Sequence, residues 1–255
     1  MMQPLHALSP LRDIRLQGIG ALLVSGQRKP EGELLMNTTF NTLKPVLLMM
    51  AIVIGAMLEC GRAEAGQTET LTVAGGCFWC VESDFEQVQG VQEVISGYTG
   101  GTVKNPSYKQ VVRGGTGHYE AVQIQFDPTV VSRETLLNMF FRSVDPTDAG
   151  GQFCDRGDSY RTAIFVSNKA EKALAQTAKG NAQRALDQRI VTPILAAKPF
   201  YKAEDYHQDY YKGRKIVITR FGPVRQEKAY KKYRNACGRD QRVKQLWGKA
   251  APFIN

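Results

Sequence analysis

Residues 71–80 read LTVAGGCFWC and predict a strand, a sharp turn and the start of a helix. The apolar run Leu71–Ala74 has the composition of a buried strand. The glycine pair after it permits a tight turn and leaves backbone room around Cys77. At a helix N-terminus, Cys77 would face unpaired backbone N–H groups and the positive end of the helix dipole. Both favour the thiolate, which is the nucleophilic form of cysteine.

The residues that follow Cys77 extend this chemistry. Phe78 and Trp79 provide apolar surface beside the thiol, and Cys80 places a second thiol three residues further on. A single buried cysteine with aromatic neighbours is more often part of a core than a catalyst. The second cysteine and the glycine pair favour a redox-active site.

Strands and helices of varied length follow along the chain, without an internal repeat. Hydrophobic periodicity and capping residues predict further strands over residues 91–97, 118–126, 160–166 and 190–195. They predict helices over residues 77–88, after Ser132, from a cap at Ser167 to Leu186, and over residues 203–211. The mixture predicts an α+β fold in which helices pack against a mixed β-sheet.

Alternation along the strand His118–Phe126 places Glu120 on the same face as Val122 and Ile124. Burial there would raise the pKa of the carboxyl and keep it protonated near neutral pH, as a general acid requires. The alternative is an exposed edge position or a pairing with arginine. His118 lies on the same face and is an alternative base for Cys77.

The sequence contains no pattern for a metal or a nucleotide. A zinc site would need four ligands, and the single C-x-x-C has no second pair or H-x-x-x-H to complete it. There is no G-x-G-x-x-G in a strand–helix context and no Walker motif. We therefore expect neither a metal nor a cofactor, and we interpret His207, among tyrosines, as a core histidine whose ring nitrogens are hydrogen-bonded, rather than as a ligand.

The N-terminal region predicts export. Pro45–Leu58 is an apolar run of 14 residues, preceded by Lys44 and followed by an A-x-A motif at Ala63. A membrane span needs about 20 residues, whereas a secretory h-region has about 7–15. We predict a signal peptide over residues 36–65 and a periplasmic or secreted mature chain, so that residues 1–35 precede the native start. The alternative is a membrane anchor formed by residues 45–58.

Most of the net charge of +9 lies near the C-terminus, where Arg225–Asn255 contains nine Lys or Arg and two Asp or Glu. We interpret residues 223–255 as a basic tail with a solvated face, which carries Cys237 and follows a catalytic domain over residues 66–222. Binding of nucleic acid is the alternative role for such a tail, and we expect none. We expect a monomer.

Seven short motifs occur in a fixed order between residues 71 and 211: GGCFWC, SGYTGG, NPSY, GHYEAV, DPTD, DRGDSYRTAIF and EDYHQDYY. Together they resemble the peptide methionine sulfoxide reductases of the A type. The resemblance implies the two-layer α+β fold and the reduction of methionine-S-sulfoxide, free or in proteins, without a cofactor. It implies Cys77 as the nucleophile that attacks the sulfoxide sulfur and Glu120 as the acid that protonates the oxygen. It also implies a substrate site made of Phe78, Trp79, Tyr108, Asp155 and Tyr160.

The same resemblance implies that the sulfenic acid of Cys77 condenses with a second thiol. Thioredoxin, or a periplasmic thioredoxin-like donor, then reduces the disulfide. Cys237, Cys80 and Cys154 are the candidate resolving cysteines, and we favour Cys237, with Cys80 next. The alternative function is a thioredoxin-like dithiol–disulfide oxidoreductase that uses the Cys77/Cys80 pair. Against it, tryptophan lies between the cysteines rather than before them.

Overall fold

The protein is described from a computed structural model, which covers residues 49–50, 67–220 and 222–254 in the detail given below. The chain divides into residues 1–63 and a compact body of residues 64–255. The predicted signal peptide and the residues before it lie outside the described residues, as does the alternative anchor except for its helical pair 49–50. Within the described part of the chain, no helix is long and apolar enough to cross a membrane.

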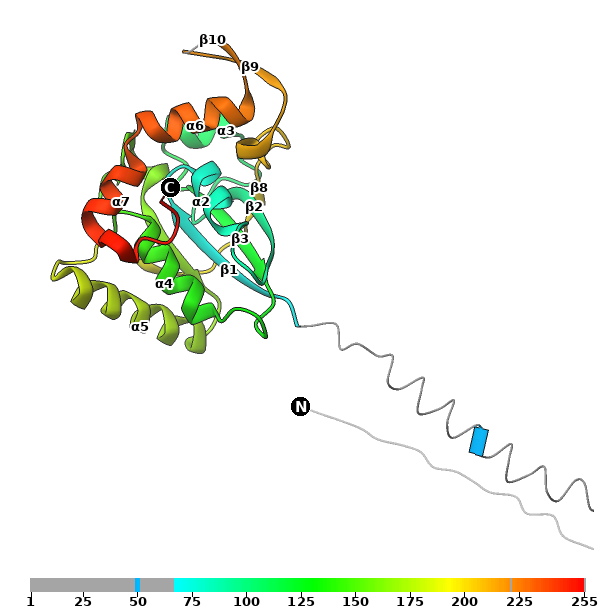
Figure 1. The fold of residues 1–255 in the computed structure, drawn as a ribbon, viewed down its shortest axis with the longest axis vertical. Helices are drawn as coiled ribbons and strands as arrows, with labels where there is room; N and C mark the ends of the chain where they lie inside the picture. The colour runs from blue at the N-terminus through cyan, green and yellow to red at the C-terminus, as the bar shows by residue number, and fades with distance from the viewer. Residues whose placement is uncertain (1–48, 51–66, 221, 255) are drawn as a thin grey trace, which may run out of the picture. The chain divides into compact units, whose positions relative to one another are not determined.

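A six-stranded sheet lies at the centre of the body (Figure 1) and has the order β7-β6-β1-β3-β2-β8. All neighbouring strands pair antiparallel except β6 and β7, which are parallel, so the sheet is mixed. The strands are β1 (Glu69–Gly75), β2 (Val91–Thr99), β3 (Tyr119–Phe126), β6 (Thr162–Val166), β7 (Ile194–Ala196) and β8 (Tyr201–Lys202).

Helices α2 (Phe78–Phe85), α4 (Arg133–Ser143) and α5 (Lys169–Leu186) supply the layer that packs on this sheet. Their apolar residues join the side chains of the central strands in one core, which includes Val73, Val81, Phe85, Ile124, Leu137, Phe140, Ile164 and Ala178. A smaller cluster around Ala121 and Phe165 lies on the opposite face of the sheet, covered by Leu195 and Phe200. The predicted two-layer α+β sandwich is therefore confirmed.

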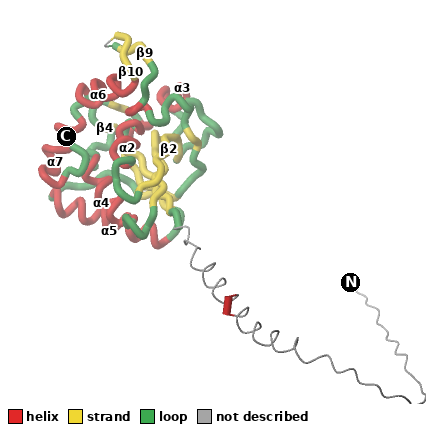
Figure 2. The backbone as a smooth tube through the Cα atoms, turned by 45° about the vertical axis from the view of Figure 1, so that its right-hand side comes forward, coloured by secondary structure: helices red, strands yellow, loops and turns green. Residues whose placement is uncertain are grey.

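Two short hairpins and one short helix complete the fold outside the central sheet and its helical layer. A short hairpin of β4 (Gly151–Gln152) and β5 (Asp155–Arg156) follows α4, and α3 (Tyr108–Arg113) lies between β2 and β3. A second hairpin, β9 (Ile216–Thr219) with β10 (Gly222–Arg225), extends away from the sheet and its helices (Figure 2).

Some local predictions were wrong at the ends of elements. Helix α2 stops at Phe85 rather than Val88. The cap of α5 is Asn168 rather than Ser167, because the Asn168 side chain accepts the backbone N–H of Glu171 at 2.9 Å. Strand β7 is shorter than predicted, and the residue before it is Pro193, which has no N–H to donate to a ladder.

The predicted helix over residues 203–211 is a series of turns that ends in a 3-10 helix, Tyr210–Lys212. The side chain of Gln208 forms hydrogen bonds with backbone groups of Ser96 and Ala203. Gln208 accepts the backbone N–H of Ser96 and donates to the Ser96 carbonyl, each at 3.0 Å. Gln208 also donates to the carbonyl of Ala203 at 2.9 Å. The Gln208 side chain thus ties the segment to the edge of β2.

The C-terminal residues form α6 (Gln226–Ala236) and α7 (Arg239–Trp247), which pack on the body (Figure 1). Val243, Trp247 and Phe253 belong to the main core. The tail was interpreted as a solvated basic face, and for two of its arginines this is wrong. Arg234 and Arg239 have side chains that are only 11% and 2% exposed.

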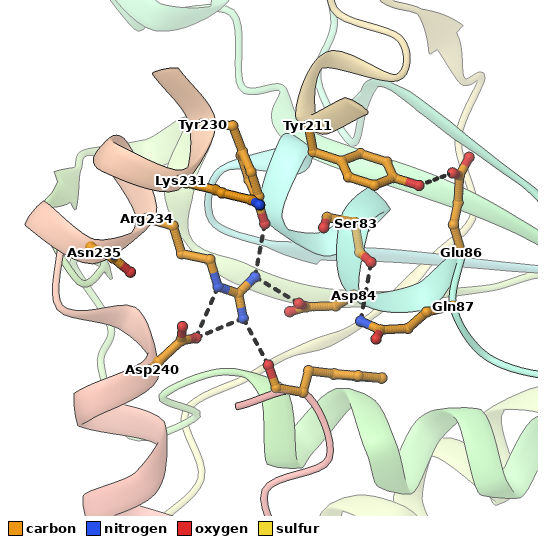
Figure 3. Close-up of a pocket in the computed structure, with 11 residues that line it drawn as sticks. Ser83, Asp84, Glu86, Gln87, Tyr211, Tyr230, Lys231, Arg234, Asn235 and Asp240 are labelled. Carbon is orange, nitrogen blue, oxygen red and sulfur yellow. Dashed lines mark hydrogen bonds and ion pairs between the residues drawn. The ribbon is translucent and has the colours of Figure 1, made fainter. Parts of the chain in front are cut away.

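Arg234 is buried because a network of ion pairs and hydrogen bonds surrounds its guanidinium group (Figure 3). The Arg234 guanidinium lies 2.6 Å from the Asp84 carboxylate on α2 and 2.7 Å from Asp240. It also donates to the hydroxyl of Tyr230 at 2.9 Å and to the carbonyl of Phe253 at 3.3 Å. These residues line one side of a pocket of about 630 Å³, which also includes Ser83 and Gln87 of α2. The tail is therefore held to the helix that carries Cys80.

Candidate active site

Cys77 lies at the turn between β1 and α2, where the sequence predicted it. Gly76 has a φ of 81°, and a Cβ atom at this position would lie 2.6 Å from the Cβ of Gln152. The glycine therefore allows both the left-handed turn and the close approach of the neighbouring loop. Cys77 caps α2, and its carbonyl accepts the backbone N–H of Cys80 at 3.1 Å. Its side chain is buried, with 6% exposure.

Glu120 reaches Cys77 from β3, a central strand of the sheet. Its Oε2 accepts the backbone N–H of Phe78 at 3.1 Å, and only 2% of the residue is exposed. Burial raises the pKa of this carboxyl to about 8, and among the described residues no ion pair involves it. The predicted burial is confirmed, and the edge-strand alternative is wrong.

The structure does not support the expectation that the thiolate form of Cys77 is favoured. The free N–H group at the start of α2 bonds to Glu120 instead of facing the sulfur. The hydrogen bond to Cys80, burial and the nearby carboxyls of Glu120 and Asp155 raise the pKa of the Cys77 thiol well above its ordinary value. These surroundings favour the protonated thiol form of Cys77.

The pKa of the Cys80 thiol is shifted in the opposite direction, below its ordinary value. Its hydrogen bond with Cys77 lowers the pKa of the Cys80 thiol, and the guanidinium charges of Arg239 and Arg234 act in the same direction against the cost of burial. Arg239 is held in place by hydrogen bonds to the carbonyl oxygens of Gly75 at 3.2 Å and Ser143 at 2.9 Å. The cations of the C-terminal helices thus act on the second thiol of the C-x-x-C.

An aromatic surface surrounds the two thiols. The rings of Trp79 and Tyr210 stack with centroids 3.8 Å apart, and His207 lies 5.1 Å from the Phe78 ring and 5.5 Å from Trp79. A cavity of about 370 Å³ opens beside them, lined by Trp79, Tyr210, Thr219, Arg220, Ala229 and Tyr233. Phe78 is fully buried behind this surface, whereas Trp79 is partly exposed.

Two tyrosine hydroxyls lie on the side of Glu120. Tyr160 is within hydrogen-bonding reach of both Glu120 and Tyr108. Burial raises the pKa of both phenols, so both remain protonated hydrogen-bond donors. The backbone N–H of Tyr108 is fixed by the Glu204 carboxylate at 3.0 Å, which orients the start of α3.

Asp155 connects this site to the C-terminal helices. Its Oδ1 accepts the hydroxyl of Tyr233 on α6 in a short hydrogen bond, and burial raises the pKa of the carboxyl. The preceding residue, Cys154, is joined by a disulfide to Cys237 at the end of α6, with Cα atoms 4.8 Å apart. Cys77 and Cys80 are both free in the same structure.

The structure shows what His118, the alternative base for Cys77, and His207 contact. His118 accepts the backbone N–H of Gly101 through Nδ1 at 3.2 Å, and its Nε2 lies 2.7 Å from the carbonyl of Val103, so both ring nitrogens serve the backbone. It is not placed as a base for Cys77. His207 is buried as predicted, and burial lowers its pKa to about 4. The prediction that its ring nitrogens are hydrogen-bonded is wrong, because neither has a hydrogen-bond partner within the described residues.

Glu204, His207 and Tyr210 also contact the site residues, although none of them was predicted as a site residue; all three belong to the motif EDYHQDYY. Tyr233 was also missed, because nothing near it in sequence points to Asp155. The structure brings together every residue of the predicted site: Cys77, Phe78, Trp79, Tyr108, Glu120, Asp155 and Tyr160.

A cysteine at a helix start, a buried carboxyl with a raised pKa, an aromatic surface and a second free thiol lie together on this mixed α+β sandwich, and these are the groups that a thiol-dependent oxidoreductase needs. The chain belongs to the peptide methionine sulfoxide reductase family, whose family model matches residues 69–250. The predicted resemblance is therefore confirmed. The match includes α6 and α7, so the C-terminal helices are part of the family's own domain.

Curated relatives agree with this assignment. The chain is 48% identical over 185 residues to peptide methionine sulfoxide reductase MsrA 2 of Caulobacter vibrioides, covering 72% of this chain and 88% of the relative. It is 46% identical over 182 residues to the MsrA enzyme of Bacillus subtilis, covering 71% of this chain and 96% of the relative.

Solved structures show the same fold. Methionine sulfoxide reductase A of Corynebacterium diphtheriae is 33% identical with a TM-score of 0.54, over 59% of this chain and 76% of that one. Reduced Mxr1 from Saccharomyces cerevisiae is 30% identical with a TM-score of 0.56, over 58% of this chain and 87% of that one.

Proposed function

We propose that this protein reduces methionine-S-sulfoxide, free or within proteins, to methionine by thiol chemistry at Cys77. Membership of the family gives the reaction class, that of a peptide-methionine (S)-S-oxide reductase. The observation that supports the mechanism best is the Glu120 carboxyl. It is bound to the N–H of the residue next to Cys77 and stays largely protonated at neutral pH.

The two sides of the site match the two ends of a methyl sulfoxide. The methyl group packs against Phe78 and Trp79, while the oxygen lies toward Glu120 and the hydroxyls of Tyr108 and Tyr160. Protonated donors are suited to a sulfoxide oxygen, which is only an acceptor. The carboxyl of Asp155 shapes the site through its bond to Tyr233.

In the chemical step, the Cys77 sulfur bonds to the sulfoxide sulfur while Glu120 protonates the oxygen. The hydroxyl then passes to the Cys77 sulfur and methionine leaves. The proton of the Cys77 thiol restores Glu120, so the products are methionine and a Cys77 sulfenic acid. Because the pKa of Cys77 is raised at rest, substrate binding has to favour its deprotonation, by bringing the sulfoxide oxygen rather than water to Glu120.

Cys80 is the best-placed resolving cysteine. Its thiol hydrogen-bonds to Cys77, its pKa is lowered, and it is free, whereas Cys237 is bonded to Cys154. This supports the reverse of the order favoured from the sequence, in which Cys237 came first. The Cys80 sulfur attacks the Cys77 sulfenic sulfur, a Cys77–Cys80 disulfide forms, and water leaves.

We also propose an electron donor, an oligomeric state and a location for this reaction. Thioredoxin, or a periplasmic thioredoxin-like protein, supplies the electrons, and the protein acts as a monomer after export and removal of residues 36–65. The apolar run followed by Ala-Glu-Ala supports export. N-terminal sequencing of the exported protein tests it: a chain that starts near Gly66 agrees, and an intact residue 36–65 segment contradicts it. The thioredoxin-like alternative is set aside by the family match.

The activity is tested on the two separated epimers of methionine sulfoxide with dithiothreitol as reductant. We expect the S epimer alone to be reduced, and Cys77→Ala to abolish its loss. Reduction by Cys77→Ala would rule out the nucleophile. Cys80→Ser should lose turnover with thioredoxin while still forming the first methionine, and full thioredoxin-linked turnover would exclude Cys80 as the resolving cysteine.

A further inference from the structure

We propose that the β9–β10 hairpin is an accessory binding surface for protein substrates, which holds an extended, acidic segment of an oxidised protein next to its methionine sulfoxide. The inference rests on the proposed function and deepens it, since it names the kind of substrate that the enzyme prefers. The occupant of the hairpin is the polypeptide that flanks the sulfoxide, so free methionine sulfoxide does not use this surface.

The hairpin has one covered face and one uncovered face. Half-buried residues alternate with exposed residues along both strands. Val217 and Val224 lie opposite each other across the hairpin, and both pack against the cluster that contains Cys77 and Cys80. The covered face therefore holds the hairpin beside the active site.

The uncovered face is apolar. Ile216 and Ile218 are 72% and 83% exposed, the highest exposed fractions among the large hydrophobic side chains of the described residues. Pro223 lies opposite Ile218 and Arg225 lies opposite Ile216, and both are exposed. Residues directly opposite each other in an antiparallel pair share a face. Single exposed apolar side chains are ordinary, whereas neighbouring ones with a polar rim indicate an interaction surface.

Each strand of the hairpin also has an edge that no other strand covers, within the described part of the chain. An extended polypeptide can add to such an edge through main-chain hydrogen bonds, which do not depend on its side chains. This mode of binding suits an enzyme that has to accept methionine sulfoxide in many sequence contexts. Each strand has four residues, so at about 3.3 Å per residue it can pair with about four residues of substrate.

The hairpin adjoins the aromatic wall of the substrate site. Thr219 and Arg220, at the end of β9, line the cavity of about 370 Å³ that opens at Trp79 and Tyr210. Trp79 belongs to the wall against which the methyl group of the substrate packs. A methionine sulfoxide held at this wall therefore has its neighbouring residues within reach of the cavity and the hairpin.

The charge of this region favours an acidic polypeptide as the occupant. Residues 213–232 contain seven Lys or Arg and one Asp or Glu. Arg214, Lys215, Arg220 and Arg225, in or next to the hairpin, are all exposed. Such a surface attracts acidic segments and speeds their encounter with the site. A second copy of the chain, docked through the same face, would bring like charges together instead.

Steady-state kinetics with dithiothreitol as reductant test this without a protein donor. The substrates are free methionine-S-sulfoxide and an unstructured peptide of leucine and glutamate, with about five residues on either side of a methionine-S-sulfoxide. For Ile216→Ser/Ile218→Ser we expect KM for the peptide to rise about tenfold, with kcat unchanged, because uniform binding is lost. Both constants for free methionine-S-sulfoxide should stay unchanged, which also shows that the variant is folded.

The matched control is Val130→Ser, which removes an exposed apolar side chain outside the hairpin. It should equal the wild type on both substrates. Changing the charge of the peptide gives a second readout that needs no variant. With lysine in place of glutamate, we expect the wild-type KM to rise about fivefold at low salt, and the difference to shrink as salt increases.

An unchanged peptide KM in Ile216→Ser/Ile218→Ser would overturn the inference and leave the proposed function intact. A defect that occurs only with thioredoxin as reductant would also overturn it, and would assign the face to the donor. A wild-type dimer that the variant converts to a monomer, with the peptide KM unchanged, would assign the face to a second copy. If the wild type does not reduce free methionine-S-sulfoxide, the proposed function itself is contradicted.

Discussion

The Arg234 guanidinium of α6 lies 2.6 Å from the Asp84 carboxylate of α2, and that carboxylate is 2% exposed. Removing one partner of a buried ion pair leaves the other charge without compensation, which costs about 3–5 kcal/mol. We therefore expect Arg234→Gln to lower the free energy of unfolding by about that amount. It should also raise the pKa of the Cys80 thiol, because a nearby positive charge is lost.

The matched control for Arg234→Gln is Lys231→Gln, which removes a positive charge from the same helix at an exposed position. We expect a change within about 0.5 kcal/mol for this variant. Denaturant unfolding measures the first effect, and the absorbance of the thiolate as a function of pH measures the second. Equal stability losses in the two variants would show that the buried pair is not stabilising.

The raised pKa of Glu120 predicts that the rate of formation of the first methionine depends on pH. Its carboxyl has a pKa of about 8 and must be protonated to donate to the sulfoxide oxygen. The acid form is present below that pKa, so we expect the single-turnover rate to fall as pH rises through about 8. Glu120→Gln should slow the step by about 10²–10⁴-fold and abolish this limb of the profile. An unchanged alkaline limb in the variant would assign it to another group.

The same residue predicts how stability depends on pH. Because the pKa of Glu120 is raised in the folded state, its contribution to stability is present below its ordinary value of 4.5 and is lost as pH rises through about 8. Glu120→Gln carries no such proton linkage. We expect the difference in unfolding free energy between wild type and variant to shift in favour of the variant across this range. A constant difference would contradict the raised pKa.

Alanine variants at Gly76 and Gly114 separate the cost of backbone strain from the cost of steric crowding. Gly76 and Gly114 have similar φ values, 81° and 85°, but a Cβ at Gly76 would meet Gln152 at 2.6 Å, while nothing lies within 4 Å of one at Gly114. Both alanine variants should lose about 1–3 kcal/mol, because a residue with a Cβ is strained at these positive φ values. We expect only Gly76→Ala to lose more than this and to lower activity, since it displaces the loop next to Cys77. Thermal unfolding and turnover with dithiothreitol measure the two effects.

The start of α5 offers a test of its observed cap. Asn168 accepts the backbone N–H of Glu171, so Asn168→Ala should lower the free energy of unfolding by about 1 kcal/mol. Ser167→Ala is the matched control one residue earlier and should have little effect. The reverse order in a denaturant titration would place the cap at Ser167 after all.

Much of the fold and the centre of the site could be predicted because both depend on local patterns. Alternation located β3 and turned Glu120 toward the helical layer, and the glycine pair located the turn at Cys77. The cap at Ser132 was also correct, since its side chain accepts the N–H of Thr135 at 3.1 Å. Each of these features involves residues within a few positions of one another.

The features that the sequence could not predict depend on contacts between residues far apart in the chain. The Cys154–Cys237 bond joins positions 83 residues apart, and nothing in either local sequence selects that pairing. The pKa of Cys77 was misjudged because Glu120, 42 residues from Phe78, takes the N–H that the helix start would otherwise offer to the sulfur. The burial of Arg239 likewise depends on carbonyl groups of Gly75 and Ser143, which no charge pattern reveals.

The amide of Gln208 has a consequence for solubility. By accepting from the N–H of Ser96 and donating to its carbonyl, it offers β2 the pair of bonds that a neighbouring strand would make. Strand β8 beside it pairs at only two positions, Gly97 with Lys202 and Tyr98 with Tyr201. A long exposed edge is a template for another copy of the chain. One side chain thus closes part of this edge to β-pairing with another copy of the chain.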